Sequence, residues 1–363
     1  MKPLTFQYDA LPARVVFGVG AIARLPEEAA RLHLHRALII STAGQRKHAE
    51  RAKELLGPLA VGVFANAVMH TPGEVTEAAM VQVADLRVDG LVAIGGGSAI
   101  GLSKSLALRT DLPQIVLPTT YAGSEATPIL GETVANVKHT QRSEKILPET
   151  ILYDVDLTVG LPVSVSMASG LNAMAHAAEA LYAPDRNPLT NLMAEAALNA
   201  LIDALPQIHD RADDIDARTT ALWGAWLSGS CLGVTTMGLH HKLCHTLGGT
   251  FGLPHAETHA VLLPHALAYN LPFAPDAHRT LSRVFLEPDP ARALAEFARR
   301  LQLPRALREL DMPETALDSA ADIAVRNPYP NPRPLERKAI RALLARAWAG
   351  SRSSRVRKSK HWA

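Results

Sequence analysis

The sequence has few cysteines, with only Cys231 and Cys244 among its 363 residues. Two thiols are too few for the disulfide framework of a small secreted domain, so we expect both to be free. The sequence also lacks a run of about 18 apolar residues, the length that a membrane-spanning helix requires. Its N-terminal segment, MKPLTFQYDALPARVVFG, has no continuous apolar stretch of the kind found in secretory signals. These absences predict a cytoplasmic protein with no membrane partner.

Acidic residues are missing from the C-terminal segment 351–363, which contains five Lys or Arg side chains. The whole chain has 37 basic and 35 acidic side chains, a net charge of +2. Without this segment the balance is 32 basic minus 35 acidic, or −3. The positive charge is therefore local to the tail, which we expect to be disordered. The rest of the chain has no general attraction for nucleic acid or anionic membranes.

Hydrophobic side chains make up 48% of the sequence and charged ones 20%, a balance that excludes a wholly disordered or coiled-coil chain. From Arg36 onward, short apolar runs alternate with helix-compatible stretches, which is typical of parallel strands joined by crossover helices. We predict strands at 37–41, 61–64, 90–94 and 114–120, and an edge strand or hairpin arm at ARVVFG. The predicted fold is α/β plus all-α, with a Rossmann-like open parallel sheet domain at 1–157 and a helical domain at 158–350.

A glycine-rich segment follows the third of these strands and consists of Gly95, Gly96, Gly97 and Ser98. Because glycine has no side chain, a phosphate can approach the backbone N–H groups at the start of the next helix. Ser98 could cap that helix or donate to the phosphate. A second polar loop follows the next strand and contributes Thr119, Thr120 and Ser124. Two such loops at neighbouring strand ends predict a dinucleotide site, although no GxGxxG motif is present and the glycines alone could form a tight turn.

Histidines are concentrated in the helical part, and their spacing is regular. Asn172 and His176 are four residues apart, which places both on one face of a helix. His241 and His245 repeat that spacing, and His255 follows a glycine-rich turn. Three imidazoles from two helices and a loop could bind a metal, with Asn172 as a weak fourth ligand, or act as acid and base. Each histidine alone could equally be an ordinary capped or surface side chain.

Four segments in this order resemble the iron-containing alcohol dehydrogenase superfamily: GGGSAIG, PTTYAGSEATP, LPVSVSMASGLNAMAHAAEALY and HKLCHTLGGTFGLPHAETHAVLLPHALAYN. The resemblance covers residues 5–350, and within that superfamily the chain is most similar to the maleylacetate reductases. Members of that branch use NADH or NADPH to reduce the carbon–carbon double bond of maleylacetate, giving 3-oxoadipate in the bacterial degradation of aromatic compounds. The resemblance implies a dehydroquinate synthase-like fold, a homodimer, and a dicarboxylate substrate in the cleft between the domains.

Matched residue by residue, the resemblance implies a role for each motif. The glycine loop binds the cofactor pyrophosphate, and the polar loop after the next strand lies near the nicotinamide. Three histidines match the metal ligands of metal-dependent members, namely His176, His241 and His255. His245 matches the histidine near the nicotinamide. These four histidines and Asn172 are the predicted catalytic residues.

Three positions depart from the pattern of metal-dependent, NAD-selective members. Asn172 stands where they have an Asp as fourth metal ligand, and Gly101 replaces the Asp that follows the glycine loop. Both differences are shared with the maleylacetate reductase branch, whose members are described as working without a metal. Thr42 stands where NAD-selective members have an Asp, which removes a charge that would repel a 2′-phosphate. We therefore expect no metal requirement, and NADPH accepted alongside NADH.

The chemistry of the candidate reactions also differs. A simple carbonyl needs a Lewis acid or proton donor at its oxygen before it accepts hydride. A conjugated ketone carries its own electron sink, and imidazole can donate a hydrogen bond to the enolate oxygen or a proton to the α carbon.

Two other functions stay open. The first is a metal-dependent alcohol dehydrogenase or aldehyde reductase of the same superfamily. The second is a non-catalytic dinucleotide-binding protein whose basic tail contacts nucleic acid. A dicarboxylate substrate would also need donors for its carboxylates, and the candidates by charge are Arg142, Lys145, Lys242 and Arg326.

Overall fold

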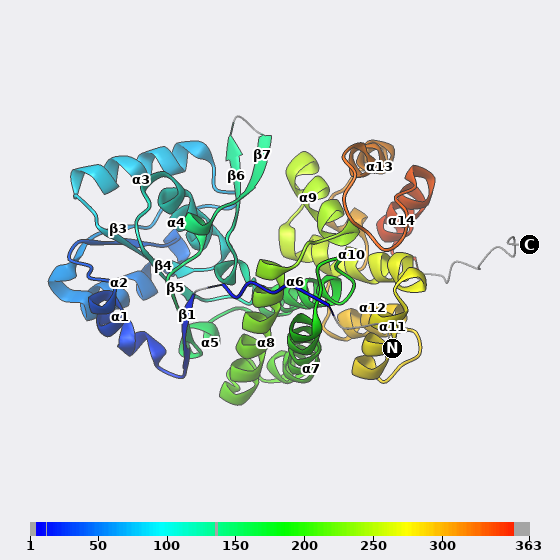
Figure 1. The fold of residues 1–363 in the computed structure, drawn as a ribbon, viewed down its shortest axis with the longest axis horizontal. Helices are drawn as coiled ribbons and strands as arrows, with labels where there is room; N and C mark the ends of the chain where they lie inside the picture. Colours follow the sequence, from blue (N-terminus) through cyan, green and yellow to red (C-terminus); the bar gives the residue numbers. More distant parts are fainter. Residues whose placement is uncertain (1–4, 12, 135–136, 352–363) are drawn as a thin grey trace, which may run out of the picture.

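The computed structural model describes residues 5–11, 13–134 and 137–351, so segment 352–363 of the basic tail lies outside the described residues. Figure 1 shows a sheet domain on the left and a helical domain on the right. The predicted fold class, an α/β domain followed by an all-helical one, is confirmed. Within the described ranges, no helix combines the length and the apolar character needed to cross a bilayer.

The main sheet has six parallel strands in the order β1-β8-β5-β4-β2-β3. They span Arg14–Gly18 (β1), Ala37–Ile40 (β2), Ala60–Phe64 (β3), Gly90–Gly95 (β4), Gln114–Pro118 (β5) and Thr150–Asp154 (β8). The central strands are fully buried and rich in aliphatic residues, as expected for a parallel sheet covered on both faces. Because all the strands are parallel, their carboxyl ends meet at one edge of the sheet.

Four helices cover the two faces of this sheet: Leu25–Arg31 (α1), Arg46–Leu56 (α2), Gly73–Asp85 (α3) and Gly97–Thr110 (α4). Side chains alternate along each strand, so neighbouring residues pack on opposite faces of the sheet and belong to different hydrophobic cores. Leu38 and Leu91 pack with α3 and α4, whereas Ile39 and Val92 pack with α1 and α2. The loops at the carboxyl edge are therefore supported by two packed layers.

The chain after β5 departs from the predicted repeat of strand and helix. An antiparallel hairpin, Ile129–Val134 (β6) and Val137–Arg142 (β7), takes the place of a crossover helix. A side chain of α4 contacts the hairpin at its start, because Lys104 donates to the Ile129 carbonyl of β6. The chain then returns as β8, which the sequence pattern did not predict. β1 pairs with β8 in parallel, so the ARVVFG run is an edge strand rather than a hairpin arm.

The helical domain begins with the short helix Asp156–Val159 (α5). Its other helices are Val163–Ala180 (α6), Pro188–Asp210 (α7), Ile215–Val234 (α8), Leu239–Phe251 (α9), His255–Asn270 (α10), Pro275–Phe285 (α11), Pro290–Arg300 (α12), Ala316–Arg326 (α13) and Arg337–Ala349 (α14). Every residue from Ser166 to Ala180 in α6 is buried, which makes α6 a central helix. Cys231 of α8 and Cys244 of α9 are buried free thiols, so that prediction is confirmed.

Two glycines bring the domains into close contact. Gly123, in the loop after β5, lies against Gly229 of α8, and a Cβ on Gly229 would come within 2.5 Å of the Gly123 carbonyl oxygen. Gly123 also has φ +79, a conformation that favours glycine. Segment 5–11 crosses from the sheet domain to the helical domain nearby (Figure 1). The loop that follows β5 is thus part of the interface between the two domains.

Replacing Gly229 by Ala is expected to lower the free energy of unfolding by about 1–3 kcal/mol, because the added methyl group meets backbone rather than a movable side chain. Urea denaturation measures the loss. Gly160→Ala is the control, since a Cβ at Gly160 has no neighbour within 4 Å. Equal stability of the two variants would contradict the close contact between the domains.

Candidate active site

The glycine loop joins the end of β4 to the start of α4. Gly95 has φ +150, and a Cβ there would lie 2.9 Å from the Cβ of Ala99. A Cβ on Gly96 would lie 2.9 Å from the methyl carbon of Thr120, whereas a Cβ on Gly97 would have no neighbour within 4 Å. The first two glycines therefore permit the tight turn, and the third leaves open space before the helix.

The first turn of α4 has no side-chain cap. Its N-cap is Gly96, so the suggestion that Ser98 caps this helix is wrong; Ser98 lies inside the first turn and is half-buried. Uncapped N–H groups at the positive end of a helix bind phosphate. The open space at Gly97 and these N–H groups fit the pyrophosphate of a dinucleotide.

The second polar loop lies against the first. Thr119 donates its backbone N–H to the Gly95 carbonyl over 3.0 Å, and its buried hydroxyl has no partner among the described residues. Thr120 touches the glycine loop, and Ser124 lies further along the same segment. Thr42 follows β2, which is the neighbour of β4 in the sheet. The structure thus gathers the predicted cofactor residues along the carboxyl edge of the sheet.

Lys104 of α4 anchors the second loop from inside the domain. Its buried ammonium group donates to the carbonyl oxygens of Ser124, Thr127 and Ile129. Burial lowers the pKa of Lys104 to about 7, and the charge of buried Glu125 acts in the opposite direction. One cation that holds three carbonyls fixes the path of the loop.

This loop reaches the helical domain through the carbonyl of Ala122. His176 of α6 donates its Nε2–H to that oxygen over 3.1 Å, and its Nδ1 lies 2.7 Å from Nε2 of His241. His241 of α9 in turn directs Nδ1 at the carboxylate of Glu179, 2.6 Å away. A continuous chain of hydrogen bonds therefore joins the sheet domain to Glu179, deep in the helical domain.

Glu179 accepts several further hydrogen bonds. Its two oxygens accept the hydroxyl of Tyr182 and the backbone N–H groups of Gly238, His240 and His241 at the start of α9. Burial alone would raise the pKa of Glu179, but the hydrogen bond from His241 and the charge of His241 lower it to about 2. A carboxylate on α6 therefore caps α9 and stays ionised.

The hydrogen-bond partners also assign the protons of the two histidines. A carbonyl oxygen only accepts, so Nε2 of His176 carries a hydrogen. Burial keeps the pKa of His176 well below its usual value, which leaves Nδ1 as a lone pair. His241 must then donate from Nε2 to His176 and from Nδ1 to Glu179. His241 is thus an imidazolium with both donors occupied.

Six imidazoles from three helices form one group, hereafter the histidine cluster: His176, His240, His241, His245, His255 and His259. His259 of α10 has its ring centroid 4.4 Å from that of His255, 5.0 Å from that of His241 and 6.1 Å from that of His176. The rings of His245 and His255 are stacked, with centroids 6.3 Å apart. These two residues are half-buried, and the other four are buried.

The structure therefore brings the four predicted catalytic histidines together, and their individual roles stay predictions. Asn172 lies one turn before His176 on α6, is 3% exposed, and has an amide oxygen with no partner in the described part of the chain. The expectation for Gly101 also stays a prediction. A Cβ at Gly101 would lie 2.6 Å from the hydroxyl of Thr71, so Thr71 packs directly against this glycine.

The four basic residues considered for substrate binding have other surroundings. Arg142 donates to a backbone carbonyl of α8, and Lys145 forms an exposed ion pair of 3.1 Å. Lys242 lies 5.9 Å from the centroid of an aromatic ring, and Arg326 is exposed at the end of α13. A role for any of them in binding carboxylates stays a prediction.

A divalent metal does not fit the predicted ligand set. The facing nitrogens of His176 and His241 are 2.7 Å apart and hydrogen-bonded to each other. Two nitrogen ligands of one tetrahedral zinc lie about 3.3 Å apart, and an amide at Asn172 adds no negative charge. Among the described residues, the ligand atoms that lie within 4.8 Å of one another belong instead to His240, Cys244 and His259. We therefore derive no step of the reaction through a metal.

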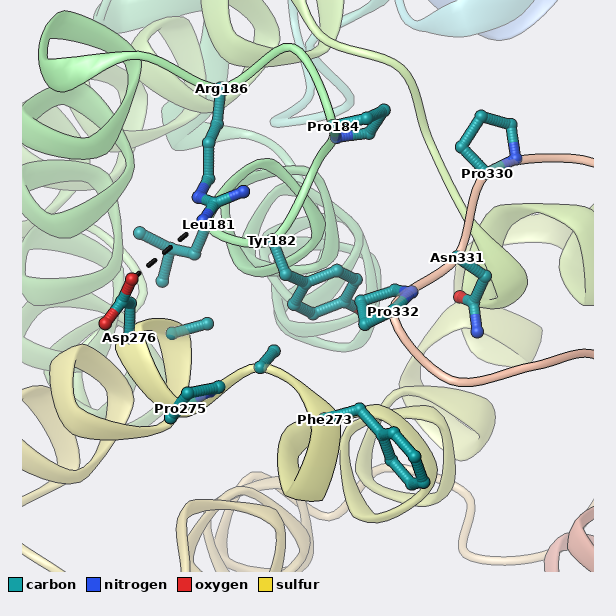
Figure 2. A pocket seen from close by; sticks show the side chains of 12 residues that line it. Leu181, Tyr182, Pro184, Arg186, Phe273, Pro275, Asp276, Pro330, Asn331 and Pro332 are labelled. Atoms are coloured by element: carbon teal, nitrogen blue, oxygen red, sulfur yellow. Dashed lines mark ion pairs between the residues drawn. The ribbon is translucent and has the colours of Figure 1, made fainter. Parts of the chain in front are cut away.

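A cavity of about 360 Å³ adjoins Glu179 through Tyr182, one of its lining residues. Figure 2 shows Tyr182 beside Pro332 on its wall, with the ion pair of Arg186 and Asp276 on another side. Its lining includes none of the predicted site residues. The cavity is therefore separate from the histidine cluster.

Sequence reasoning did not identify four polar groups that build the site, namely Lys104, Glu179, His240 and His259. Each is a buried polar residue in a largely apolar helix. A polar residue within an apolar helical pattern is the feature of the sequence that could have indicated them. Glu179, for example, follows His176 by three residues in AMAHAAEALY, and His259 follows His255 by four. Both spacings place the second residue on the same helix face as the first.

Comparison with known proteins agrees with this geometry. The family model for iron-containing alcohol dehydrogenase matches residues 12–155, and the model for the C-terminal part of the Fe-containing alcohol dehydrogenase family matches residues 166–348. Maleylacetate reductase of Rhizobium sp. (strain MTP-10005) is 54% identical over 97% of this chain and 99% of that protein.

Solved structures give the same result. A maleylacetate reductase from Agrobacterium tumefaciens has a TM-score of 0.93 at 54% identity, over 97% of this chain and 100% of that chain. A putative alcohol dehydrogenase from Ralstonia eutropha JMP134 has a TM-score of 0.94 at 50% identity, over 97% of this chain and 99% of that chain.

Glu179→Gln is expected to lower the free energy of unfolding by about 3–5 kcal/mol, because one partner of a buried ion pair is removed. Turnover should fall roughly 10- to 100-fold, since His241 loses the anion that orients it. Urea denaturation and steady-state kinetics measure the two effects. Glu296→Gln is the control, because Glu296 forms an exposed ion pair with Arg292. A Glu179→Gln variant that matches this control would refute the capping role.

Proposed function

The chain belongs to the iron-containing alcohol dehydrogenase family, and we propose that it reduces the carbon–carbon double bond of maleylacetate to give 3-oxoadipate. The observation that carries the proposal is the similarity to maleylacetate reductases over nearly the whole chain. The complete histidine cluster supports it, because a protein that only binds a dinucleotide has no need for converging imidazoles. The protein is thus an oxidoreductase that acts on a CH–CH group.

The cofactor is NADH or NADPH, which supplies the hydride when bound. The uncapped first turn of α4 binds the pyrophosphate, and the open space at Gly97 admits it. Thr42 places no negative charge at the end of β2. A 2′-phosphate would meet no repulsion from this residue, which supports the use of both cofactors.

Maleylacetate is a conjugated ketone, and this decides what the protein must provide. Hydride that adds to the alkene carbon β to the ketone moves the electron pair of the double bond onto the ketone oxygen. A hydrogen-bond donor at that oxygen stabilises the enolate, and a proton added to the α carbon completes the reduction. One hydride and one proton are added in total, so no further redox partner is required.

The exposure of each histidine in the cluster suggests which of these tasks it can perform. His245 and His255 are its half-buried members and so are the ones that a substrate can reach from solvent. We assign to these two residues the hydrogen bond to the enolate oxygen and the proton for the α carbon. His241 contributes differently, because both its donors are occupied. Held by Glu179, it donates to His176 and so fixes how these two rings are turned.

The remaining expectations are also part of this proposal. The protein is a cytoplasmic homodimer that takes a small dicarboxylate in the catabolism of aromatic compounds, through the β-ketoadipate pathway. Two buried free thiols support a reducing compartment. The net charge of −3 outside segment 351–363 supports the absence of a nucleic-acid partner.

Protein treated exhaustively with a chelator, and checked for residual metal, is expected to oxidise NADH with maleylacetate as fast as untreated protein. The reason is that the enolate needs hydrogen-bond donors rather than a Lewis acid. The decrease in NADH absorbance measures the rate. Activity that is lost on chelation and restored by iron or zinc would instead support a metal-dependent enzyme of the family. Inactivity with maleylacetate before and after chelation would overturn the proposed function.

Gly97→Val is expected to raise the dissociation constant for NADH about tenfold or more, because the side chain fills the space meant for the pyrophosphate. The fold should be unaffected, since a Cβ at Gly97 has no neighbour within 4 Å. Fluorescence titration measures the affinity, and thermal unfolding checks the fold. An unchanged affinity for NADH would refute the assignment of the glycine loop.

A further inference from the structure

Two of the buried imidazoles in the histidine cluster have a ring nitrogen without a partner. His176 and His241 use both nitrogens in the chain that ends at Glu179. In contrast, Nε2 of His240 lies 3.0 Å from Nδ1 of His259, and this contact leaves Nδ1 of His240 and Nε2 of His259 without a hydrogen bond to any residue that the structure describes. Buried polar atoms are nearly always paired in folded proteins. An unpaired nitrogen at a candidate active site therefore marks a place that a ligand completes.

Of these two residues, His259 has its ring against a half-buried member of the cluster. The ring of His259 lies 4.4 Å from that of His255, one of the two half-buried members. His240 lies further inside, with its ring beside those of His241 and His259 and its Nε2 3.7 Å from Sγ of Cys244. A substrate that touches His255 is thus adjacent to His259.

The pair of His240 and His259 contains one hydrogen in its shared contact. As a neutral imidazole each ring carries one hydrogen, so one of the two facing nitrogens donates in this contact and the other accepts. If His240 donates the shared hydrogen, His259 carries its own hydrogen on Nε2 and is a donor there. A ketone with two carboxylates offers only acceptor oxygens. Such a substrate therefore selects the arrangement in which His240 donates.

We propose that His259 is a further substrate-contacting residue, whose Nε2–H, oriented by His240, donates a hydrogen bond to an oxygen of the substrate. The inference rests on the proposed function, since it takes the substrate to be a dicarboxylate ketone. It supplies a donor from within the histidine cluster itself. A neutral N–H in a buried site forms a strong, charge-assisted hydrogen bond with a carboxylate or enolate oxygen.

Two substitutions at His259 distinguish the effect of losing the hydrogen bond from the effect of losing the volume of the ring. Gln places an amide N–H near the position of the histidine Nε2, whereas the amide of Asn reaches only as far as Nδ1. His259→Asn is expected to raise KM for maleylacetate about 10- to 100-fold, the effect of losing one hydrogen bond to a charged group. His259→Gln should recover most of that loss. The dissociation constant for NADH should stay within about twofold of wild type in both variants.

His265→Asn is the matched control. His265 lies on the same helix, α10, is also buried, and also has a ring nitrogen without a partner. Its neighbouring charge is Arg346 of α14, outside the histidine cluster. This variant is expected to change thermal stability and to leave KM for maleylacetate unchanged. Equal KM values for His265→Asn and His259→Asn would overturn the inference.

A second measurement covers the case in which His259→Asn does not fold. In wild-type protein with ¹⁵N-labelled histidine, adding NAD⁺ and 3-oxoadipate should shift an Nε2–H resonance that NAD⁺ alone does not shift. Absence of any such shift would overturn the inference. Wild-type protein that does not turn over maleylacetate overturns the proposed function and this inference with it. Active wild type with unchanged kinetics in His259→Asn overturns the inference alone.

Discussion

The buried carboxylate of Glu179 is the interaction on which the site depends. A carboxyl group taken out of water becomes neutral unless donors surround it, and here backbone N–H groups of α9, Tyr182 and His241 do so. Once ionised, Glu179 requires a hydrogen on Nδ1 of His241, and His241 then donates to His176. One charge on α6 therefore fixes where α9 begins, how two imidazole rings are turned and which of them is charged.

The loop after β5 connects this network to the cofactor side. Lys104 fixes one end of the loop by collecting three of its carbonyl oxygens, and His176 holds its middle through the Ala122 carbonyl. Gly123 and Gly229 let the loop lie directly on α8. The position of the histidine cluster relative to the glycine loop is thus set by short contacts along a single segment. Hydride transfer needs such control, because reacting atoms must be held within a few tenths of an ångström.

The sequence predicts those parts of the site that depend on neighbouring residues. A strand, a glycine run and a helix are adjacent in the chain around Gly97, and histidines four apart share a helix face wherever the helix lies. The rest depends on packing between distant segments. Glu179 meets His241 across 62 positions, and β1 meets β8 across the whole sheet domain.

The amide at Asn172 follows from the charge balance around it. In this structure the imidazolium of His241 and the carboxylate of Glu179 already neutralise each other. An Asp at position 172, one turn from His176 and buried, would add an anion that a metal dication could balance but this network could not. An Asn side chain has nearly the same shape as Asp and is also polar, but it carries no charge. A conjugated ketone has less need of a metal at this position, because its own double bond accepts the electron pair and leaves only an oxygen anion to be stabilised.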